Sequence, residues 1–208
     1  MVGIILAAGL STRMGRPKQL LPLGYGEAVI DVVVQAARSH LSRVIVVVGH
    51  RGAEIADHLA PHDVAVVTNP SFERGMLSSV QCGVRAAGEA AGYLICLGDQ
   101  PAMDGQVVGA VVAAAVRSGK GIVIPTHRGR GGHPVYVGRR YGAEVLSLTG
   151  EEGGLRAVTR GHPDDTLELE VNSPLVLEDM DTPADYEREC QRRGIAPVSA
   201  AGSPEKEV

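Results

Sequence analysis

Short, uninterrupted runs of aliphatic and β-branched residues recur along the chain. Runs of this kind, bounded by glycine or polar residues, are typical of strands that are buried on both faces of a parallel sheet. They predict strands at Val2–Leu6, Val44–Val48, Val64–Val67, Leu94–Leu97 and Ile122–Ile124, and a further strand at Val135–Val137.

Longer stretches between these runs place apolar residues at helical spacing. They predict helices over Val29–Ser39, Ala53–Leu59, Leu77–Ala87 and Gln106–Arg117, shorter helices over Ala143–Leu148 and Leu155–Arg160, and a last helix over Ala184–Arg193. Thr182 and Pro183 favour the start of that last helix, because threonine caps helices and proline suits the first helical position.

Alternating strands and helices predict βαβ units, whose right-handed crossovers place helices on both faces of the sheet. We therefore expect a three-layer α/β/α fold of the Rossmann-like type, with a mainly parallel sheet, in a single domain over residues 1–194. Residues 195–208 are rich in Pro, Ser, Gly and Glu and predict a disordered C-terminal tail.

The composition narrows the classes of function. The 208 residues hold 20 Lys and Arg against 24 Asp and Glu, and this net charge of −4 argues against a dedicated nucleic-acid-binding protein. No apolar run is as long as a membrane helix, and the first residues show no basic leader pattern. Cys82, Cys96 and Cys190 are far apart and predict reduced thiols. We expect a cytoplasmic protein with neither a nucleic-acid nor a membrane partner.

The first predicted strand leads into a glycine-rich loop. In open parallel sheets ligands bind at the carboxyl ends of strands, and the small residues of Leu6-Ala7-Ala8-Gly9 let backbone N–H groups approach an anion. Arg13 and Lys18 add positive charge, so the segment predicts a triphosphate site. Five residues separate Gly9 from Gly15, so the loop is neither a Walker A motif nor the dinucleotide fingerprint.

Two further segments follow predicted strands. Asp99 lies in Gly98-Asp99-Gln100-Pro101, where a carboxylate beside a phosphate site suits Mg²⁺, although Asp and Pro also suit a simple turn. The segment 69–79 leads into a helix, whose free N–H groups and serine hydroxyls suit a nucleotide, although a turn with capping serines fits as well. Asp104 fits the N-cap of the helix that follows.

The first loop, L-A-A-G-x-S-x-R-M-G-x-x-K, closely resembles the signature of the nucleotidyltransferases related to molybdenum-cofactor biosynthesis. The L-A-A-G sequence and the following Gln19-Leu20-Leu21-Pro22 are most similar to the molybdenum-cofactor cytidylyltransferases. Similar elements recur as N-P…G-M…S at 69–79, G-D-x-P at 98–101, G-H-P-V at 132–135 and D-x-D-T-P-x-D at 179–185. The resemblance covers residues 3–193 and implies a fold of the nucleotide-diphospho-sugar transferase type.

The resemblance also implies roles for individual residues. The nucleotide is expected to contact Leu6, Ala7, Ala8, Gly9, Arg13, Lys18, Asn69, Gly75, Ser79, Gly98 and Asp99. Arg13, Lys18 and Asp99 are expected to act in catalysis, and Asp99 and Asp181 to hold Mg²⁺. The acceptor is expected near Gln100, Pro101, His133 and Arg156, whereas Phe72 and Met76 are expected to pack.

The implied activity is transfer of CMP from CTP to a phosphorylated molybdopterin-type cofactor, with release of pyrophosphate; a molybdenum enzyme or its accessory proteins would be further partners. One segment departs from the family pattern, because Glu151 replaces an aspartate and Arg156 falls one residue later. A guanylyltransferase is an alternative, because the same loop could serve GTP, although L-A-A-G disfavours GTP by analogy. The departure leaves open a nucleotidyltransferase that uses a different phosphorylated acceptor, such as a sugar phosphate or phospholactate. It also leaves open a non-catalytic nucleotide-binding accessory protein for molybdenum enzymes.

Overall fold

A computed structural model describes residues 1–151 and 153–198 of the chain. Within these residues, eight strands form one sheet in the order β3-β2-β1-β4-β7-β5-β6, with β8 paired to β5. The strands are β1 (Val2–Ala7), β2 (Val44–Val48), β3 (Ala65–Thr68), β4 (Gly92–Leu97), β5 (Ile122–His127), β6 (Arg130–Gly131), β7 (Val135–Gly138) and β8 (Thr166–Glu170). The α-helices are α1 (Val29–Arg38), α2 (Gly52–Leu59), α3 (Met76–Ala87), α4 (Gly105–Ser118), α5 (Gly142–Ser147), α6 (Leu155–Gly161) and α7 (Pro183–Arg193). Short 3₁₀ helices are η1 (Thr12–Met14), η2 (Lys18–Leu20), η3 (Phe72–Arg74), η4 (Arg139–Tyr141), η5 (Pro163–Asp165) and η6 (Pro174–Leu177).

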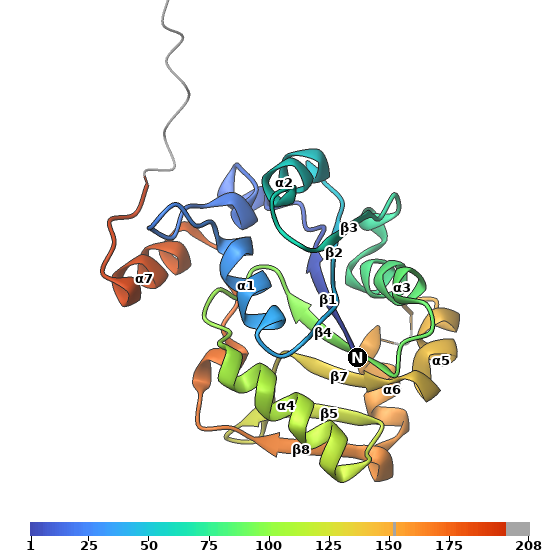
Figure 1. Ribbon diagram of the computed structural model, residues 1–208. Helices are drawn as coiled ribbons and strands as arrows, with labels where there is room; N and C mark the ends of the chain where they lie inside the picture. The colour runs from blue at the N-terminus through green and yellow to red at the C-terminus, as the bar shows by residue number, and fades with distance from the viewer. Residues whose placement is uncertain (152, 199–208) are drawn as a thin grey trace, which may run out of the picture.

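The half of the sheet formed by β3, β2, β1 and β4 is parallel. Beyond it the chain reverses, because β7 pairs antiparallel with both β4 and β5, whereas β8 runs parallel to β5. Helices lie on both faces of the sheet (Figure 1), so the prediction of a three-layer fold with a mainly parallel sheet is confirmed. Because four parallel strands end at one edge, the loops that follow them meet there.

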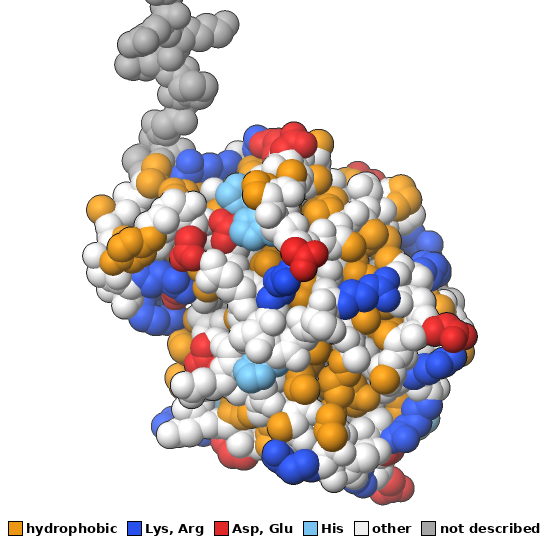
Figure 2. Space-filling view, in the orientation of Figure 1, with side chains coloured by type: hydrophobic (Ala, Val, Ile, Leu, Met, Phe, Trp, Pro, Cys, Tyr) orange, Lys and Arg blue, Asp and Glu red, His pale blue; other side chains and the backbone are white. Residues whose placement is uncertain are grey.

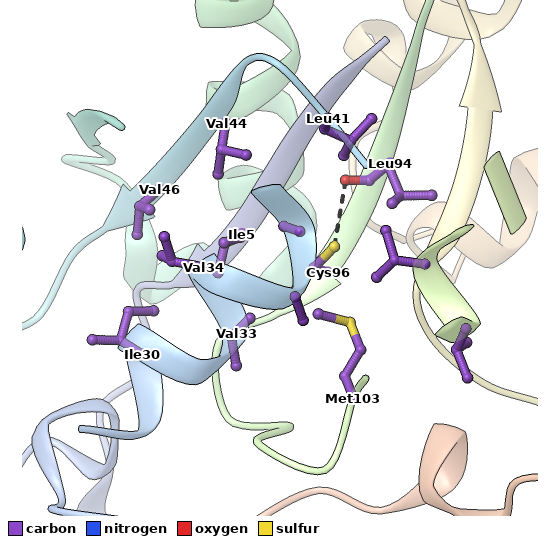
Figure 3. Close-up of a cluster of buried hydrophobic side chains, with 14 of the residues drawn as sticks. Ile5, Ile30, Val33, Val34, Leu41, Val44, Val46, Leu94, Cys96 and Met103 are labelled. Carbon is purple, nitrogen blue, oxygen red and sulfur yellow. Dashed lines mark hydrogen bonds between the residues drawn. The ribbon is translucent and has the colours of Figure 1, made fainter. Parts of the chain in front are cut away.

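Two apolar clusters hold the three layers together. One packs α1, α2 and α4 against the sheet and contains Ile5 and Cys96 (Figure 3). The other packs α3, α5 and α6 against the opposite face and contains Ile4 and Ile95. Neighbouring strand residues thus serve opposite faces, as the alternation of side chains along a strand requires. The central strands are buried on both sides, which is why their sequences are continuous apolar runs.

A third apolar cluster joins α7 to the segment that follows β1. Met14 packs with Tyr186 of α7, and the Tyr186 hydroxyl donates a hydrogen bond of 2.8 Å to the carbonyl oxygen of Pro22. Ile195, the first residue of the predicted tail, packs against the same cluster. Most of that predicted tail, residues 199–208, lies outside the described residues.

Three strands differ from the expectation, and one of them, β6, is a two-residue strand in a glycine-rich segment where no strand was expected. β3 is at an edge of the sheet and its residues are partly exposed, so its apolar run is not buried on both faces. The apolar-run pattern does not predict β8, because Leu167 and Leu169 alternate there with exposed glutamates and only the leucines pack on the core. Within 1–151 and 153–198, no helix is long and apolar enough to cross a membrane.

The start of β8 is tied to its surroundings through Asp165. Its carboxylate accepts hydrogen bonds from the Tyr141 hydroxyl at 2.6 Å, from Arg140 at 2.7 Å and from the Gly121 backbone N–H at 3.1 Å. The hydrogen bond from Tyr141, together with Arg140 and Gly121, holds the pKa of Asp165 below its usual value. This pKa shift contributes stability at neutral pH, and the contribution is lost as the pH falls through the folded-state pKa.

We expect Asp165→Ala to lower the free energy of unfolding by about 1–3 kcal/mol, because the hydrogen bonds from Tyr141, Arg140 and Gly121 to its carboxylate are then lost. Urea unfolding at neutral pH measures the loss. Asp164→Ala is the matched control, because that side chain is exposed and the hydrogen bond from Lys120 goes to the backbone carbonyl oxygen, which the substitution keeps. Equal losses in the two variants would contradict this account of Asp165.

Candidate active site

A cleft of about 380 Å³ opens at the carboxyl ends of β1 and β4. It is lined by Leu6, Ala8, Gly9, Leu10, Ser11, Thr12, Arg13, Lys18, Gln19, Phe72, Glu73, Gly75, Met76, Ser79, Leu97, Asp99 and Asp181. Of the residues expected at the nucleotide, Ala7, Asn69 and Gly98 lie outside this lining. The loops after two neighbouring parallel strands therefore meet in one cavity, as the topology requires.

The loop after β1 folds back over the cleft. Met14 in η1 is buried, and the Ser11 hydroxyl accepts a hydrogen bond of 3.2 Å from the backbone N–H of Lys18. These contacts turn the chain so that Arg13 and Lys18 both face the cavity. Apart from the residues adjacent to Gly9 in the chain, no atom of the described residues lies within 4 Å of the point where a side chain on Gly9 would begin, so the backbone here is open to a ligand.

The end of β4 approaches the end of β1 very closely. The Gly98 N–H donates a hydrogen bond of 2.9 Å to the Leu6 carbonyl oxygen, and a Cβ on Gly98 would lie 2.8 Å from that oxygen. Only glycine fits this contact. The next residue, Asp99, is thereby held beside the first loop, and its own carbonyl oxygen accepts a hydrogen bond of 3.0 Å from the Met180 N–H. That bond brings the segment before α7 to the same place.

Three charged side chains from distant parts of the chain meet in the cleft. Lys18 Nζ forms ion pairs with Asp99 Oδ2 and, at 2.7 Å, with Asp181 Oδ1. Arg13 Nη2 lies 3.3 Å from Asp181 Oδ2 at the more exposed rim. The structure thus brings together the residues that were expected to act on the phosphates and to hold a metal ion.

The pKa values follow from this arrangement. Burial opposes the charge on Lys18, but Asp99 and Asp181 outweigh it and raise the pKa of Lys18 above its usual value. The hydrogen bond from Lys18, with the charges of Lys18 and Arg13, lowers the pKa of Asp181. Burial raises the pKa of Asp99, and the adjacent Lys18 counteracts this rise. The cleft therefore contains a cation held between two acids.

The start of α3 forms the opposite wall. Asn69 is buried, and its Nδ2 donates hydrogen bonds to the hydroxyl oxygens of Ser78 at 2.8 Å and Ser79 at 3.0 Å. Asn69 therefore positions the two serines, and Ser79 lines the cleft. Gly75 has a φ of +93°, which favours glycine and lets the chain turn abruptly into the helix.

Several residues that line the cleft were not predicted from the sequence. Met76 is 59% exposed and faces the cleft, which corrects the expectation that it packs. Phe72 does pack, because a Cβ on Gly49 would lie 2.7 Å from its Cβ, but it lines the cleft as well. The residues between Gly9 and Arg13 also line it, and their place inside the glycine-rich loop is the signal that could have found them.

The residues expected at the acceptor do not all lie at one place in the structure. Gln100 is 1% exposed, and its Nε2 donates a hydrogen bond of 2.7 Å to Asp179 Oδ1. This placement corrects the expectation that Gln100 contacts an acceptor. Pro101 lines a different, neighbouring cleft with Asp179. By contrast, His133 is partly buried and lies near enough to Asp99 and Arg156 for the charges of both to act on it, although neither His133 nor Arg156 lines the 380 Å³ cleft.

The carboxylates of the cleft offer oxygen donors to a divalent metal ion. Asp99 and Asp181 direct one carboxylate oxygen each at a single cationic atom, Lys18 Nζ. Hard oxygen donors of this type suit Mg²⁺, which binds through one or two carboxylates and substrate phosphates. The side chains present therefore fit a divalent ion shared with a phosphorylated ligand.

Ligands of open α/β sheets bind at this edge, and a cationic loop facing two acids suits a phosphorylated one. The fold and the cleft thus place the chain in the class of nucleotide-binding α/β proteins. Residues 3–166 match the MobA-like NTP transferase domain, so the chain belongs to that family and is a nucleotidyltransferase. The family resemblance inferred from the first loop is confirmed.

Two relatives are similar over most of their length. The chain is 29% identical over 184 residues to the molybdenum cofactor cytidylyltransferase of Escherichia coli (strain K12), covering 88% of this chain and 92% of that protein. It is 32% identical over 197 residues to the purine catabolism protein PucB of Bacillus subtilis (strain 168), covering 90% and 94%. Relatives of comparable similarity thus have different names.

Solved structures have the same fold. The Mycobacterium tuberculosis protein Rv0371c superimposes with a TM-score of 0.77 at 26% identity, covering 92% of this chain and 98% of that one. A nucleotidyl transferase from Methanothermobacter thermautotrophicus gives a TM-score of 0.79 at 28% identity, covering 92% and 96%. Rv0371c has also been solved in complex with manganese, at a TM-score of 0.68 and 25% identity, covering 91% and 97%. That neighbour therefore takes up a divalent ion.

We expect the stability of the protein to fall as the pH drops from about 6.5 to about 4, because burial lowers the pKa of His133 to about 4. An unfolded histidine titrates near 6.5, so in this interval the unfolded chain binds the extra proton. Urea unfolding at a series of pH values measures the slope, which His133→Gln should reduce. His40→Gln, a change at an exposed histidine, serves as the control. An unchanged slope in His133→Gln would contradict the lowered pKa.

Proposed function

We propose that the protein transfers CMP from CTP to a phosphorylated molybdopterin-type cofactor and releases pyrophosphate, in a reaction that requires Mg²⁺. The observation that carries the proposal is the meeting of Lys18, Asp99 and Asp181 in the cleft beside the glycine-rich loop. The choice of cytidine and of a pterin acceptor rests on the L-A-A-G loop and on the similarity to the E. coli cytidylyltransferase.

The residues of the first loop would bind the triphosphate. The backbone of Ala8 and Gly9 is open to the cleft, and Arg13 is exposed at its rim. Lys18 already faces oxygen atoms, and phosphate oxygens offer it partners of the same kind. Across the cleft, the start of α3 and the Ser79 hydroxyl would contact the nucleoside.

Asp99 and Asp181 would hold Mg²⁺. When bound, the ion supplies charge neutralisation for the phosphate oxygens. The metal and Lys18 need the same carboxylate oxygens, so Lys18 would turn from these acids toward the triphosphate. Asp99 and Asp181 would therefore bind the metal ion when it is present and pair with Lys18 when it is absent.

The chemical step would be an in-line displacement. An oxygen of the acceptor phosphate forms a bond to the α-phosphorus of CTP, while the bond from that phosphorus to the bridging oxygen breaks and pyrophosphate leaves with the electron pair. The acceptor phosphate has a second pKa of about 6 and is already ionised at neutral pH, so no strong base is required. His133, neutral at that pH, would form part of the acceptor wall. Arg13 and Lys18 would stabilise the charge that grows on pyrophosphate.

We expect Asp99→Asn to lower kcat by about 100-fold or more, because one carboxylate that holds the metal and orients Lys18 is lost. Pyrophosphate release under saturating Mg²⁺ measures the effect, and circular dichroism checks the fold. Asp164→Asn, a change at an exposed acid in η5, should leave turnover unchanged. Full activity in Asp99→Asn would exclude the proposed role of Asp99.

We expect pyrophosphate release from CTP, in preference to the other three nucleoside triphosphates, and only when purified molybdopterin cofactor is present. The measurement compares all four nucleotides with and without the cofactor. A preference for GTP would show that the proposed nucleotide, CTP, is wrong. CTP turnover with a sugar phosphate or phospholactate, and not with the cofactor, would show that the proposed acceptor is wrong. Tight binding without release under every condition would favour a non-catalytic accessory protein, and attention would then turn to the segment that contains Glu151 and Arg156.

A further inference from the structure

A second cluster of metal-ligating side chains lies away from the active-site cleft, between α1 and the end of α2. Asp31 comes from α1, and His58 and His62 come from the end of α2 and the turn after it. One ligand atom from each residue lies within 4.8 Å of the other two. Figure 2 shows histidine side chains at the surface beside α2. The three residues are outside the lining of the 380 Å³ cleft.

The Asp31 carboxylate is the centre of the cluster. Its side chain is only 5% exposed, and burial of a carboxylate is costly unless it is paired. Oδ2 accepts a hydrogen bond of 2.7 Å from the backbone N–H of Ala28 and so caps the start of α1. His58 Nε2 lies 2.8 Å from Oδ2, and His62 Nε2 lies 3.1 Å from Oδ1. The carboxylate is therefore held in place by the backbone while both imidazoles point at it.

The two histidines are arranged as a pair. They are four residues apart, with His58 in the last turn of α2 and His62 in the turn after it, and their rings are stacked at 6.3 Å between centroids. His58 is 33% exposed and His62 is 30% exposed, so an ion could reach the nitrogen atoms from solvent. Water could then complete the coordination sphere, because the same exposure admits it.

We propose that Asp31, His58 and His62 bind a borderline divalent transition-metal ion, Zn²⁺ in the first instance. Two imidazole nitrogens and one carboxylate oxygen suit Zn²⁺, whereas Mg²⁺ prefers oxygen donors alone. With metal–ligand bonds of about 2.0–2.2 Å, ligand atoms of a tetrahedral zinc site lie roughly 3.3 Å apart, so the distances of 2.8 and 3.1 Å from Asp31 to the two histidines require only small side-chain rotations. The chemistry of this cluster therefore differs from that of Asp99 and Asp181.

Such an ion would link two elements that are separate in the chain. Asp31 lies directly after the segment between Lys18 and Ala28, and Val29 N–H donates a hydrogen bond of 3.0 Å to the Leu21 carbonyl oxygen. The ion would connect the start of α1, and with it this segment, to the end of α2. Its expected effect is on stability, because none of the three ligands faces the cleft.

The test uses the untagged full chain carrying Asp99→Asn and Asp181→Asn, so that the active-site carboxylates do not bind the probe. Zn²⁺ is titrated by calorimetry, and metal content is measured after dialysis. We expect one Zn²⁺ per chain and a higher Tm when it is bound. His58→Gln and His62→Gln should each weaken Kd by about tenfold or more and abolish the rise in Tm. The titration is repeated on wild-type protein in saturating Mg²⁺, which occupies the active-site carboxylates in place of the two substitutions.

His162→Gln is the matched control, because His162 Nε2 also lies 2.8 Å from a carboxylate oxygen, that of Glu144, but does not belong to the three-residue cluster. Co²⁺ in place of Zn²⁺ should give the intense visible absorption of a four- or five-coordinate ion in the parent and lose it in His58→Gln. No bound Zn²⁺ in either parent, or the same loss of affinity in His162→Gln as in His58→Gln, would overturn the proposal.

Discussion

The ion pairs of Lys18 with Asp99 and Asp181 are the contact on which the arrangement of the active site depends. Two carboxylates brought this close together repel each other and lose solvent, so the fold needs a positive charge between them. Each of the three residues is positioned by a different contact. The turn after β1 positions Lys18, and the close approach of Gly98 to Leu6 positions Asp99. The hydrogen bond from the Met180 N–H to the Asp99 carbonyl oxygen positions Asp181. The charged cluster of the cleft forms because these three contacts lie at the same edge of the sheet.

The sequence is sufficient to predict most of the fold, because the central strands are buried on both faces and leave no polar position in their runs. The same rule fails at the edges of the sheet. β3 has an apolar run but is partly exposed, and β8 alternates leucine with glutamate because only one of its faces meets the core. Edge strands follow local packing, which a rule based on continuous apolar runs cannot detect.

The glycine-rich loop could be predicted in detail, since its function lies in contiguous residues. Contacts between distant residues could not. Lys18 and Asp181 are 163 positions apart, and only the family resemblance suggested that they meet. Gln100 directly follows Asp99, which lines the cleft, yet the side chain of Gln100 is buried and hydrogen-bonded to Asp179. The neutral state of His133 likewise depends on how deeply the surrounding chain buries its ring, which no local pattern records.

The packing of α7 on the segment after β1 has a consequence for how the protein is made. The chain emerges from the ribosome from its N-terminus, and domains fold as their residues become available. Lys18 and Asp99 are synthesised long before Asp181 and Tyr186, so a nascent chain can complete its parallel strands while the cleft still lacks one acid and the support of Pro22 by Tyr186. The charged cluster therefore depends on residues that are made last, and a chain that stops short of Asp181 lacks one of its acids as well as the contact of Tyr186 with Pro22.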